Sequence, residues 1–481
     1  MSRRSNRKQL LPILEKVEIT DAGAEGKAVA RVDNRVVFIP FGVPGDVVDV
    51  QVTRKKKSFL EGRIISIHES SPFRVEPVCQ HFGLCGGCRW QNMDYEKQLF
   101  FKQKQVKDHF DRIGKFEYPG IRHIIASENV FYYRNKLDYT FSNRKWFTGQ
   151  KPENVDNNNS NGLGFHLTGM FDRVIDIEKC HLQPDPSNDI RLAVRAYALN
   201  KGLSFYDAKT WQGLLRNLII RNTSSGQFMV IIVFRDDEED TIRELMQFVK
   251  DKFPAVTSLM NVINGKKNDD ISDQEIRLFH GNPYLVEELA PFHTGDPLLK
   301  FKIGPVSFFQ TNAKQAAVLY RIAAEMAGFK GNETVYDLYS GTGTIACYVS
   351  KYSGNVVGLE SIPDAVSDAF ENAALNGITN VFFHAGDIAK ILNREFYDNQ
   401  GRPDIIITDP PRAGMHEKVV EQILAANPQK VIYISCNPAT QARDIQLMAD
   451  LYEIKAVQPV DMFPHTQHVE NVALLERKLG S

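Results

Sequence analysis

Cysteine offers the widest choice of chemistry in this chain, and four of its six cysteines fall in two short stretches. "VIYISCNPATQ" contains Cys436, and "CQHFGLCGGC" contains Cys79, Cys85 and Cys88. A thiolate can act as a nucleophile or as a metal ligand. In a chain without secretory features, cysteines are more often ligands or nucleophiles than disulfide partners. The surroundings of each cysteine must decide between these two roles.

Acidic residues follow three of the apolar runs in the C-terminal half. "DLYSGTGT" (337–344) has glycines that permit a tight turn against a ligand. Glu360 ends the next apolar run, nineteen residues after Gly341, where a carboxylate can accept both ribose hydroxyls. Asp387 ends the third run, suited to an adenine amino group, and Asp409 opens "DPPR" after the fourth. Each acid alone could cap a helix, but the series favours a nucleoside-containing cofactor.

These side chains need a parallel sheet to bring them together. From about residue 305, apolar strand-like runs alternate with helical runs, which favours an open α/β sheet. Such sheets bind ligands at the carboxyl ends of their strands. The pattern resembles class I S-adenosylmethionine-dependent methyltransferases, and it lacks the GxGxxG spacing of a dehydrogenase. The expected strands are 334–341, 355–361, 381–387, 404–411 and 430–438, with helices over 316–327, 364–377 and 418–427.

Cys436 ends the fifth strand, on the same ligand-binding edge. Methylation of an amino group needs no thiol, but methylation of uracil at carbon 5 does, because that carbon is too electron-poor to attack a sulfonium methyl. A thiolate that adds to carbon 6 makes carbon 5 nucleophilic. A base must then remove the carbon 5 proton so that the thiol can leave. Glu470 in "HTQHVENVALLER" is the candidate base, with His465 and His468 as rivals.

Five motifs together, "FFQTN", "DLYSGTGT", "DPPR", "SCNP" and "HVENVALL", resemble the RNA (uracil-5-)-methyltransferase family over most of the chain. The resemblance implies Cys436 as nucleophile and Glu470 as base. It also implies that S-adenosyl-L-methionine is held by Gln310, Tyr339, Glu360 and Asp409; Asp387 is added from its strand-end position alone. Thr344 stands where some members carry an Asn. The leading substrate is 23S ribosomal RNA, with transfer RNA as the alternative.

Two further classes stay open from the residues alone. One is amino-group methylation of RNA through "DPPR" with Cys436 idle, and the other is an iron–sulfur RNA-binding protein without turnover. A target uracil must be unpaired or flipped before a thiol can reach its ring. We therefore expect RNA-binding surfaces next to the methyltransferase part.

Cys79, Cys85 and Cys88 follow the spacing C-x5-C-G-G-C, and Cys180 in "DIEKCHL" is the nearest fourth ligand. Four thiolates suit zinc or a 4Fe-4S cluster. Zinc ribbons usually have two CxxC hooks, so the single hook here favours iron–sulfur. The family resemblance also points to a 4Fe-4S-binding subset. The C-x3-C-x2-C spacing of radical S-adenosylmethionine enzymes is absent. Cys347 is expected to pack in a core.

The remaining chain completes a multi-domain α/β prediction. Short β runs separated by turns predict a small OB-like barrel over 8–70. This region resembles a TRAM domain, which implies that it binds RNA. An α+β domain with the iron–sulfur site is expected over 71–300, and the Rossmann-like methyltransferase domain over 301–481. Candidate RNA contacts are "RKKK" (54–57), "FYYRNK" (131–136) and "GLLRNLIIR" (213–221).

Composition limits the partners and the location. The net charge is −1, but residues 1–60 carry twelve Lys and Arg against seven Asp and Glu, a local basic excess that suits RNA. No apolar run is long enough to span a membrane, and the N-terminus has no apolar signal-peptide core. We therefore expect a cytoplasmic monomer without a membrane partner. The Asn-rich stretch 150–162 is expected to be an exposed loop.

Overall fold

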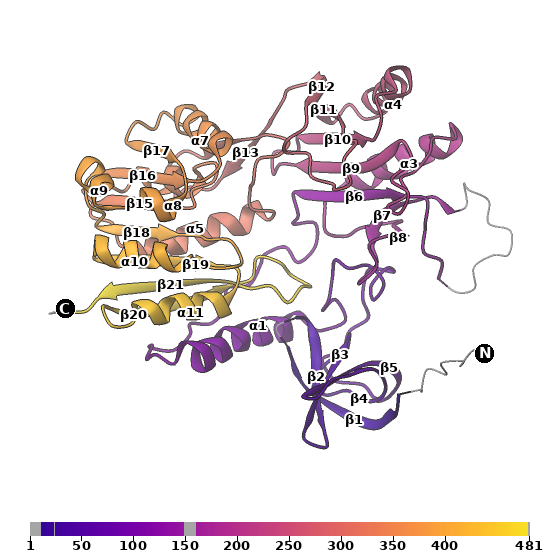
Figure 1. Cartoon of the computed structure of the whole chain (residues 1–481), viewed down its shortest axis with the longest axis horizontal. Coiled ribbons are helices and arrows are strands. Elements are labelled where there is room, and N and C mark those ends of the chain that lie inside the picture. The colour runs from indigo at the N-terminus through magenta and orange to yellow at the C-terminus, as the bar shows by residue number, and fades with distance from the viewer. Residues whose placement is uncertain (1–10, 24, 149–159, 480–481) are drawn as a thin grey trace, which may run out of the picture.

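The computed structural model describes residues 11–23, 25–148 and 160–479. Three folded parts follow one another along the chain, and the N-terminal barrel lies below the two larger sheets in Figure 1. Most of the predicted loop at 150–162 lies outside the described residues. Within the described part, no helix is both long and apolar enough to cross a bilayer.

The N-terminal part is a closed five-stranded barrel, as the spacing of short β runs predicts. Its strand β4 shows why it closes: Val48, Val50 and Val52 point inward with almost no exposed area, while their neighbours stay accessible. The basic run 54–57 lies exposed at the β4–β5 connection. The strands, in the order β1-β2-β3-β5-β4, are β1 (Ile13–Ala22), β2 (Lys27–Val32), β3 (Arg35–Pro40), β4 (Val47–Lys55) and β5 (Phe59–Glu69).

Helix α1 (Tyr95–His109) connects the barrel to the rest of the protein, and Figure 1 shows it between the barrel and the C-terminal sheet. Asp94 caps its N-terminus by accepting from two backbone N–H groups, a typical capping arrangement. Lys104 on this helix pairs with Asp21 of the barrel at 2.7 Å. The helix ends in a short π-helical turn, η1 (Phe110–Gly114).

The central part is a seven-stranded sheet in the order β12-β11-β10-β9-β6-β7-β8. Three neighbouring strands of this sheet are β10 (Phe228–Phe234), β11 (Val256–Ile263) and β12 (Ile276–Gly281), and residues 263–274 connect the antiparallel pair β11–β12. The other elements of this part are β6 (Lys136–Ser142), β7 (Gly162–His166), β8 (Val174–Asp176), α3 (Ser187–Asn200), β9 (Leu215–Asn222) and α4 (Glu239–Lys252).

The C-terminal sheet has the order β17-β16-β15-β18-β19-β21-β20, and its first five strands are parallel. All five predicted strands are confirmed: β15 (Thr334–Leu338), β16 (Asn355–Glu360), β17 (Val381–Ala385), β18 (Ile405–Thr408) and β19 (Lys430–Ser435). The last two strands, β20 (Tyr452–Val460) and β21 (Glu470–Arg477), are antiparallel to their neighbours, and β21 lies between β19 and β20. Such a sheet is covered on both faces, which matches the continuous apolar runs.

Helices cover this sheet, and a short hairpin leads into it. Asn312 caps α5, and Gly328 ends it in the left-handed conformation that favours glycine. The hairpin is β13 (Leu285–Leu289) with β14 (Leu299–Ile303). The helices are α5 (Ala313–Ala327), α6 (Thr344–Ser350), α7 (Pro363–Leu375), α8 (Ile388–Ile391), α9 (Arg394–Gln400), α10 (Glu417–Ala426) and α11 (Pro438–Met448).

Candidate active site

The glycine-rich turn after β15 is held against the end of β16 by a carboxylate. One oxygen of buried Glu360 accepts the backbone N–H of Gly341 at 3.0 Å. The other accepts from Ser361 and Ile362 at 2.7 and 3.0 Å. Gly343 has φ +77°, and a Cβ there would lie 2.7 Å from the Phe383 ring. The turn therefore requires glycine, and Glu360 sits where the sequence places a ribose acceptor.

Asp337 opens the same motif, but the sequence analysis did not single it out. Its side chain is fully buried; one oxygen accepts the backbone N–H of Ala346 at 2.9 Å in the first turn of α6, and the other oxygen has no partner among the described residues. Burial, together with the nearby charges of Asp409 and Glu360, raises the pKa of Asp337 well above its usual value. The sequence signal that could have identified Asp337 is an acidic residue inside an otherwise apolar strand. Tyr339 follows with φ +65°, and burial raises its pKa to about 12.

Asp387 does not join this group through any described contact. It is exposed, caps α8 by accepting the backbone N–H of Ala389 at 3.1 Å, and pairs with Lys390 at 3.2 Å. The hydrogen bond from Lys390 lowers the pKa of Asp387, against a small effect of burial. The helix cap accounts for its position, and its cofactor role stays a prediction.

Gln310 and Asp409 meet at the carboxyl edge of the sheet. The amide nitrogen of Gln310 lies 3.5 Å from a carboxylate oxygen of Asp409. Asn135 of the central part holds this loop by donating to the backbone carbonyls of Gln310 and Thr311 at 2.9 and 2.8 Å. Asp409 is buried, and burial raises the pKa of its carboxyl group above the usual value.

Cys436 and Glu470 are brought together by the insertion of β21 beside β19. Ser435 pairs with Asn471 in this antiparallel register, which places Cys436 across from Glu470. Glu470 is buried, with 4% of its area exposed, so it is not a surface carboxylate. Burial and then the negative charges of Glu470 and Asp409 raise the pKa of Cys436 to about 11. Burial and the charge of Asp409 raise the pKa of Glu470 well above its usual value.

Arg412, the last residue of "DPPR", contributes the positive charge at this edge. Its guanidinium interacts with the Cys436 thiol and lowers the pKa of that thiol, against the larger effect of burial. Its backbone carbonyl accepts from Asn437 at 3.0 Å, which ties it to the loop after Cys436. From the sequence alone, Arg412 is recognised only as part of the "DPPR" motif. Its contact with Cys436 depends on two loops that are distant in sequence.

The two rival bases occupy other positions. A guanidinium nitrogen of Arg412 lies 2.8 Å from Nδ1 of His468, and His465 lies 3.3 Å from the amide nitrogen of Gln98. Burial lowers the pKa of each imidazole to about 4, with further lowering by Arg412 for His468 and by Lys102 for His465. Imidazoles with such a low pKa are weak proton acceptors, whereas β21 places the Glu470 carboxylate across from Cys436.

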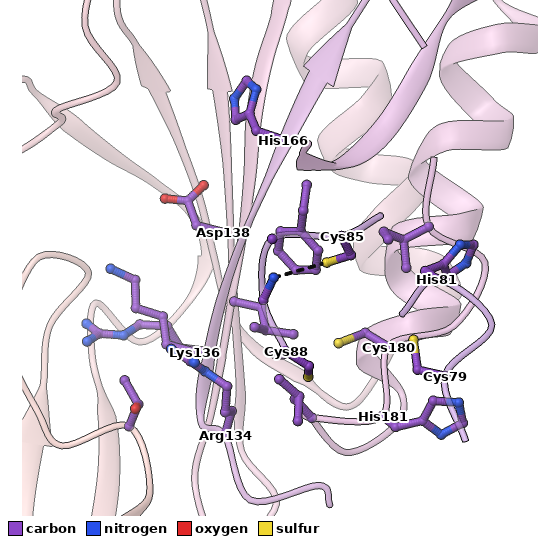
Figure 2. Close-up of a pocket in the computed structure, with 18 of the residues that line it drawn as sticks. Cys79, His81, Cys85, Cys88, Arg134, Lys136, Asp138, His166, Cys180 and His181 are labelled. Carbon is purple, nitrogen blue, oxygen red and sulfur yellow. Dashed lines mark hydrogen bonds between the residues drawn. The ribbon is translucent and has the colours of Figure 1, made fainter. Parts of the chain in front are cut away.

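The four predicted cysteine ligands line one cavity of about 620 Å³ in the central part. Figure 2 shows the sulfurs of Cys79, Cys85, Cys88 and Cys180 gathered on one side, with Arg134 and Lys136 on the other. Two sulfurs accept weak hydrogen bonds, Cys85 from the Gly87 N–H at 3.4 Å and Cys88 from the Gln91 amide at 3.8 Å. Burial raises the pKa of Cys85 to about 12, and the charges of Cys180 and Cys79 add to this.

Whether these residues could hold a single metal ion is a separate question from the gathering of the four cysteines. Among the described residues, no three His, Cys, Asp or Glu side chains stand in the arrangement of a metal ion's ligands. Cys347, predicted to be a core residue, is buried in α6 as expected.

Two arginines predicted to face RNA are buried instead. Arg216 donates to the backbone carbonyls of Asn264 and Asn268, at 2.6 and 2.8 Å. Arg221 donates to the carbonyl of Ser307 at 2.7 Å and also to that of Gly304. For these two residues the prediction was wrong, because carbonyl groups of adjacent loops satisfy the guanidinium groups inside the protein. Arg134 does line the open cavity, with its Nε unpartnered in the described structure.

Comparison with known proteins matches two parts of this architecture. Residues 217–478 match the family described as tRNA (Uracil-5-)-methyltransferase, and residues 15–65 match the TRAM domain. A Bacteroides thetaiotaomicron protein named "Uncharacterized RNA methyltransferase" is 52% identical over 94% of this chain and 99% of its own length. A Porphyromonas gingivalis protein of the same name is 50% identical over 96% of this chain and 99% of its own length.

A solved structure resembles nearly the whole chain. The Pyrococcus abyssi tRNA (uracil-54, C5)-methyltransferase in complex with S-adenosyl-L-homocysteine has a TM-score of 0.73 and 27% identity, and the match covers 96% of this chain and 100% of that one. These matches span the barrel, the central sheet and the C-terminal sheet. This chain therefore belongs to the tRNA (uracil-5-)-methyltransferase family, as an S-adenosylmethionine-dependent RNA methyltransferase with an N-terminal TRAM domain.

Proposed function

We propose that this enzyme methylates carbon 5 of a uridine in 23S ribosomal RNA through a covalent bond between Cys436 and the uracil ring. The observation that carries the proposal is the pairing of β19 with β21, which sets a thiol across from a buried carboxylate. Both side chains and the proposed cofactor acids belong to one chain, and we propose that the enzyme acts as a monomer. RNA amino-group methylation would leave this thiol–carboxylate pair without a role.

Each residue has a defined part in the reaction. The Cys436 thiolate adds to carbon 6 of the uracil, and the electron pair moves to carbon 5 and the carbonyl oxygen. Carbon 5 then takes the methyl group, and S-adenosylhomocysteine is released. Glu470 removes the carbon 5 proton, the double bond re-forms, and the thiolate leaves carbon 6. The guanidinium of Arg412 stabilises the thiolate before addition and after elimination, because it favours the charged form of Cys436.

The cofactor site fits S-adenosyl-L-methionine, which supplies an electrophilic methyl group on a positively charged sulfur. Glu360 is held rigidly by three backbone N–H groups and keeps lone pairs for ribose hydroxyls. Gln310 and Asp409 lie together at the same edge, and Tyr339 follows the glycine-rich turn, where we place the rest of the cofactor. Asp387 contributes only if its side chain leaves the α8 cap.

We propose that Cys79, Cys85, Cys88 and Cys180 hold a 4Fe-4S cluster, with zinc as the alternative. Four thiols around one cavity supply the complete ligand set of a cubane cluster. The N–H donors from Gly87 and Gln91 to two sulfurs fit the hydrogen bonding that tunes such clusters. The thiols raise one another's pKa, so a positively charged metal centre would relieve their mutual repulsion. Its role is structural or RNA-positioning rather than redox catalysis, because the methyl transfer moves no net electrons.

The choice of 23S ribosomal RNA follows from the resemblance to the cluster-containing subset of the family. Transfer RNA is the second candidate, and the similar Pyrococcus abyssi enzyme, whose name specifies uracil 54 of tRNA, favours it. The exposed basic run 54–57 of the TRAM barrel suits phosphate contacts in either RNA. The substrate therefore has to be distinguished by experiment.

The test uses RNA that contains 5-fluorouracil, together with S-adenosylmethionine. The fluorine cannot leave as a cation, so the bond to Cys436 should persist as a protein–RNA adduct that resists denaturation. Fragments of 23S ribosomal RNA and transfer RNA transcripts are compared, and Cys436→Ala is the control that should give no adduct. An RNA that is methylated but never trapped would refute the covalent route. Trapping with transfer RNA alone would refute the ribosomal substrate.

A further inference from the structure

The loop between β20 and β21 leads directly into Glu470. Val460, the last residue of β20, is the cross-strand partner of Glu470, the first residue of β21. Asp461 therefore stands one residue beyond the partner of the proposed base. A contact that holds Asp461 in place therefore also holds the loop end of the β20–β21 hairpin, where Glu470 lies.

Asp461 is fixed by an ion pair with helix α1 that has no contact with solvent. The Lys102 ammonium lies 2.6 Å from one Asp461 oxygen, and both side chains have 0% exposed area. Lys102 also donates to the Phe463 carbonyl at 3.0 Å, and the Tyr95 hydroxyl donates to the second Asp461 oxygen at 2.9 Å. The first oxygen also accepts the Phe463 N–H at 3.0 Å. These side-chain interactions join α1, or the loop itself, to the start of the loop, and the backbone N–H of Asp461 also donates to the Ile125 carbonyl at 2.9 Å.

The middle of the loop is held by the same region of the chain. The backbone N–H of His465 donates to the Gln98 side chain at 2.8 Å. The backbone N–H groups of Arg89 and Trp90 donate to the His465 carbonyl at 2.9 and 3.0 Å. Arg89 directly follows the proposed cluster ligand Cys88. The segment from the cysteine loop through α1 thus contacts the loop before Glu470 at two places, Asp461 and His465.

We propose that the Lys102–Asp461 pair positions Glu470 for proton removal from carbon 5, so that Lys102 and Asp461 are positioning residues of the methyltransferase reaction. This inference rests on the proposed function. A buried ion pair gains little net stability over an apolar pair of similar volume, because both charges lose their hydration. The pair instead holds the loop in one arrangement, because Lys102 contacts both Asp461 and the Phe463 carbonyl while Tyr95 occupies the second Asp461 oxygen.

The positioning role predicts damage to one chemical step. Thiol addition and methyl transfer depend on Cys436 and the cofactor edge, whereas removal of the carbon 5 proton depends on Glu470. A displaced carboxylate would therefore leave the enzyme bound to its methylated RNA. A misplacement of about 1 Å can slow a catalytic step roughly 100-fold. An enzyme that is merely less stable would instead lose all steps in proportion and would not accumulate the covalent intermediate.

The experiment measures turnover and covalent adduct with unmodified uridine RNA in the full-length enzyme. Lys102→Met leaves the Asp461 charge unpaired, so the double variant Lys102→Met/Asp461→Leu tests the same geometry without a buried lone charge. Arg216→Met is the matched control, because Arg216 is an equally buried cation that holds loops of the central part. Glu470→Gln provides the reference for a missing base.

We expect both Lys102 variants to show turnover reduced about 10- to 100-fold, with KM for RNA within about twofold and a denaturation-resistant adduct like that of Glu470→Gln. The Arg216→Met control should show no adduct. If Glu470→Gln accumulates adduct but both Lys102 variants do not, or if the double variant turns over normally, the positioning role is refuted while the proposed function stands. If Glu470→Gln turns over at the wild-type rate, the base assignment fails, and the positioning role fails with it.

Discussion

Replacing Glu470 by glutamine should make Cys436 more reactive while it stops turnover. Burial is the largest cause of the raised pKa of Cys436, and the negative charge of Glu470 is the next largest. Glutamine has nearly the same shape and leaves the burial unchanged, but it removes the charge. The charged thiolate is then less disfavoured, so the pKa of Cys436 falls below its value of about 11.

The size of the effect follows from the electrostatics of the site. A charge in direct contact changes a neighbour's pKa by about 1 to 3. We take the lower end, because Asp409 and Arg412 remain beside the thiol and part of the Cys436 side chain is exposed to solvent. At a pH where Glu470 is ionised in the wild type and Cys436 is still mostly protonated, the thiolate fraction should therefore rise about tenfold. Turnover should fall about 100- to 10,000-fold, the usual loss when a general base is removed.

The assay is the rate of iodoacetamide alkylation of Cys436 in the enzyme without RNA, followed by mass spectrometry of the peptide that contains it. The rate is measured from about pH 6 to pH 10, because the effect requires an ionised Glu470 and grows as the carboxyl groups titrate. Glu476→Gln is the control, since Glu476 lies on the same strand but pairs with Lys430 at 3.7 Å. Equal or slower alkylation of Glu470→Gln throughout this range would refute the electrostatic account of the site.

Three further predictions concern other parts of the molecule. Arg412→Gln should slow alkylation of Cys436 about tenfold, because it removes the charge that favours the thiolate; an unchanged pH profile would contradict its role. Cys180→Ser should lower the iron and sulfide content of anaerobically purified enzyme and its melting temperature, whereas one zinc and no sulfide in the wild type would contradict the cluster. Asp46→Asn should destabilise the barrel by about 1 to 3 kcal/mol, seen as a lower melting temperature, because Asp46 is fully buried, pairs with Arg74 at 2.6 Å and accepts two backbone N–H groups. These hydrogen bonds hold the folded-state pKa of Asp46 below its ordinary value, so its contribution should be lost as the pH falls through the acid range, and the variant should lack that dependence.

The parallel strands and their terminal acids could be predicted because their sequence signal is local. A strand that is covered on both faces has a nearly continuous apolar sequence, as Ile405–Thr408 does. The residue that follows such a strand lies at the carboxyl edge of the sheet. Glu360 and Asp409 follow directly from this rule. Asp387 obeys the same rule, yet it is exposed and caps a helix, because a strand end also begins the next helix.

The pairing of Cys436 with Glu470 could not be derived from local pattern. It depends on β21 entering the sheet between β19 and β20, and the spacing of the last two strands is equally compatible with the opposite order. The contact between Arg412 and His468 depends on the same insertion. Arg216 is a case in which the local pattern predicts the wrong environment. An arginine in an apolar run is expected to lie at the surface, but carbonyl groups from another loop can accept its hydrogen bonds in the interior.

The negative charges of Glu470 and Asp409 have two opposing effects on the site that contains Cys436. With a pKa of about 11, Cys436 is almost entirely protonated at neutral pH, so the resting enzyme offers oxidants little thiolate. When they are ionised, the same carboxyl groups suit the positive sulfonium of S-adenosylmethionine, and binding there would offset part of the charge that raises the pKa of Cys436. Thiolate formation would then depend on occupancy of the site. This dependence gives a physical reason for two carboxyl groups beside the proposed nucleophile, although each of them makes the thiol less reactive.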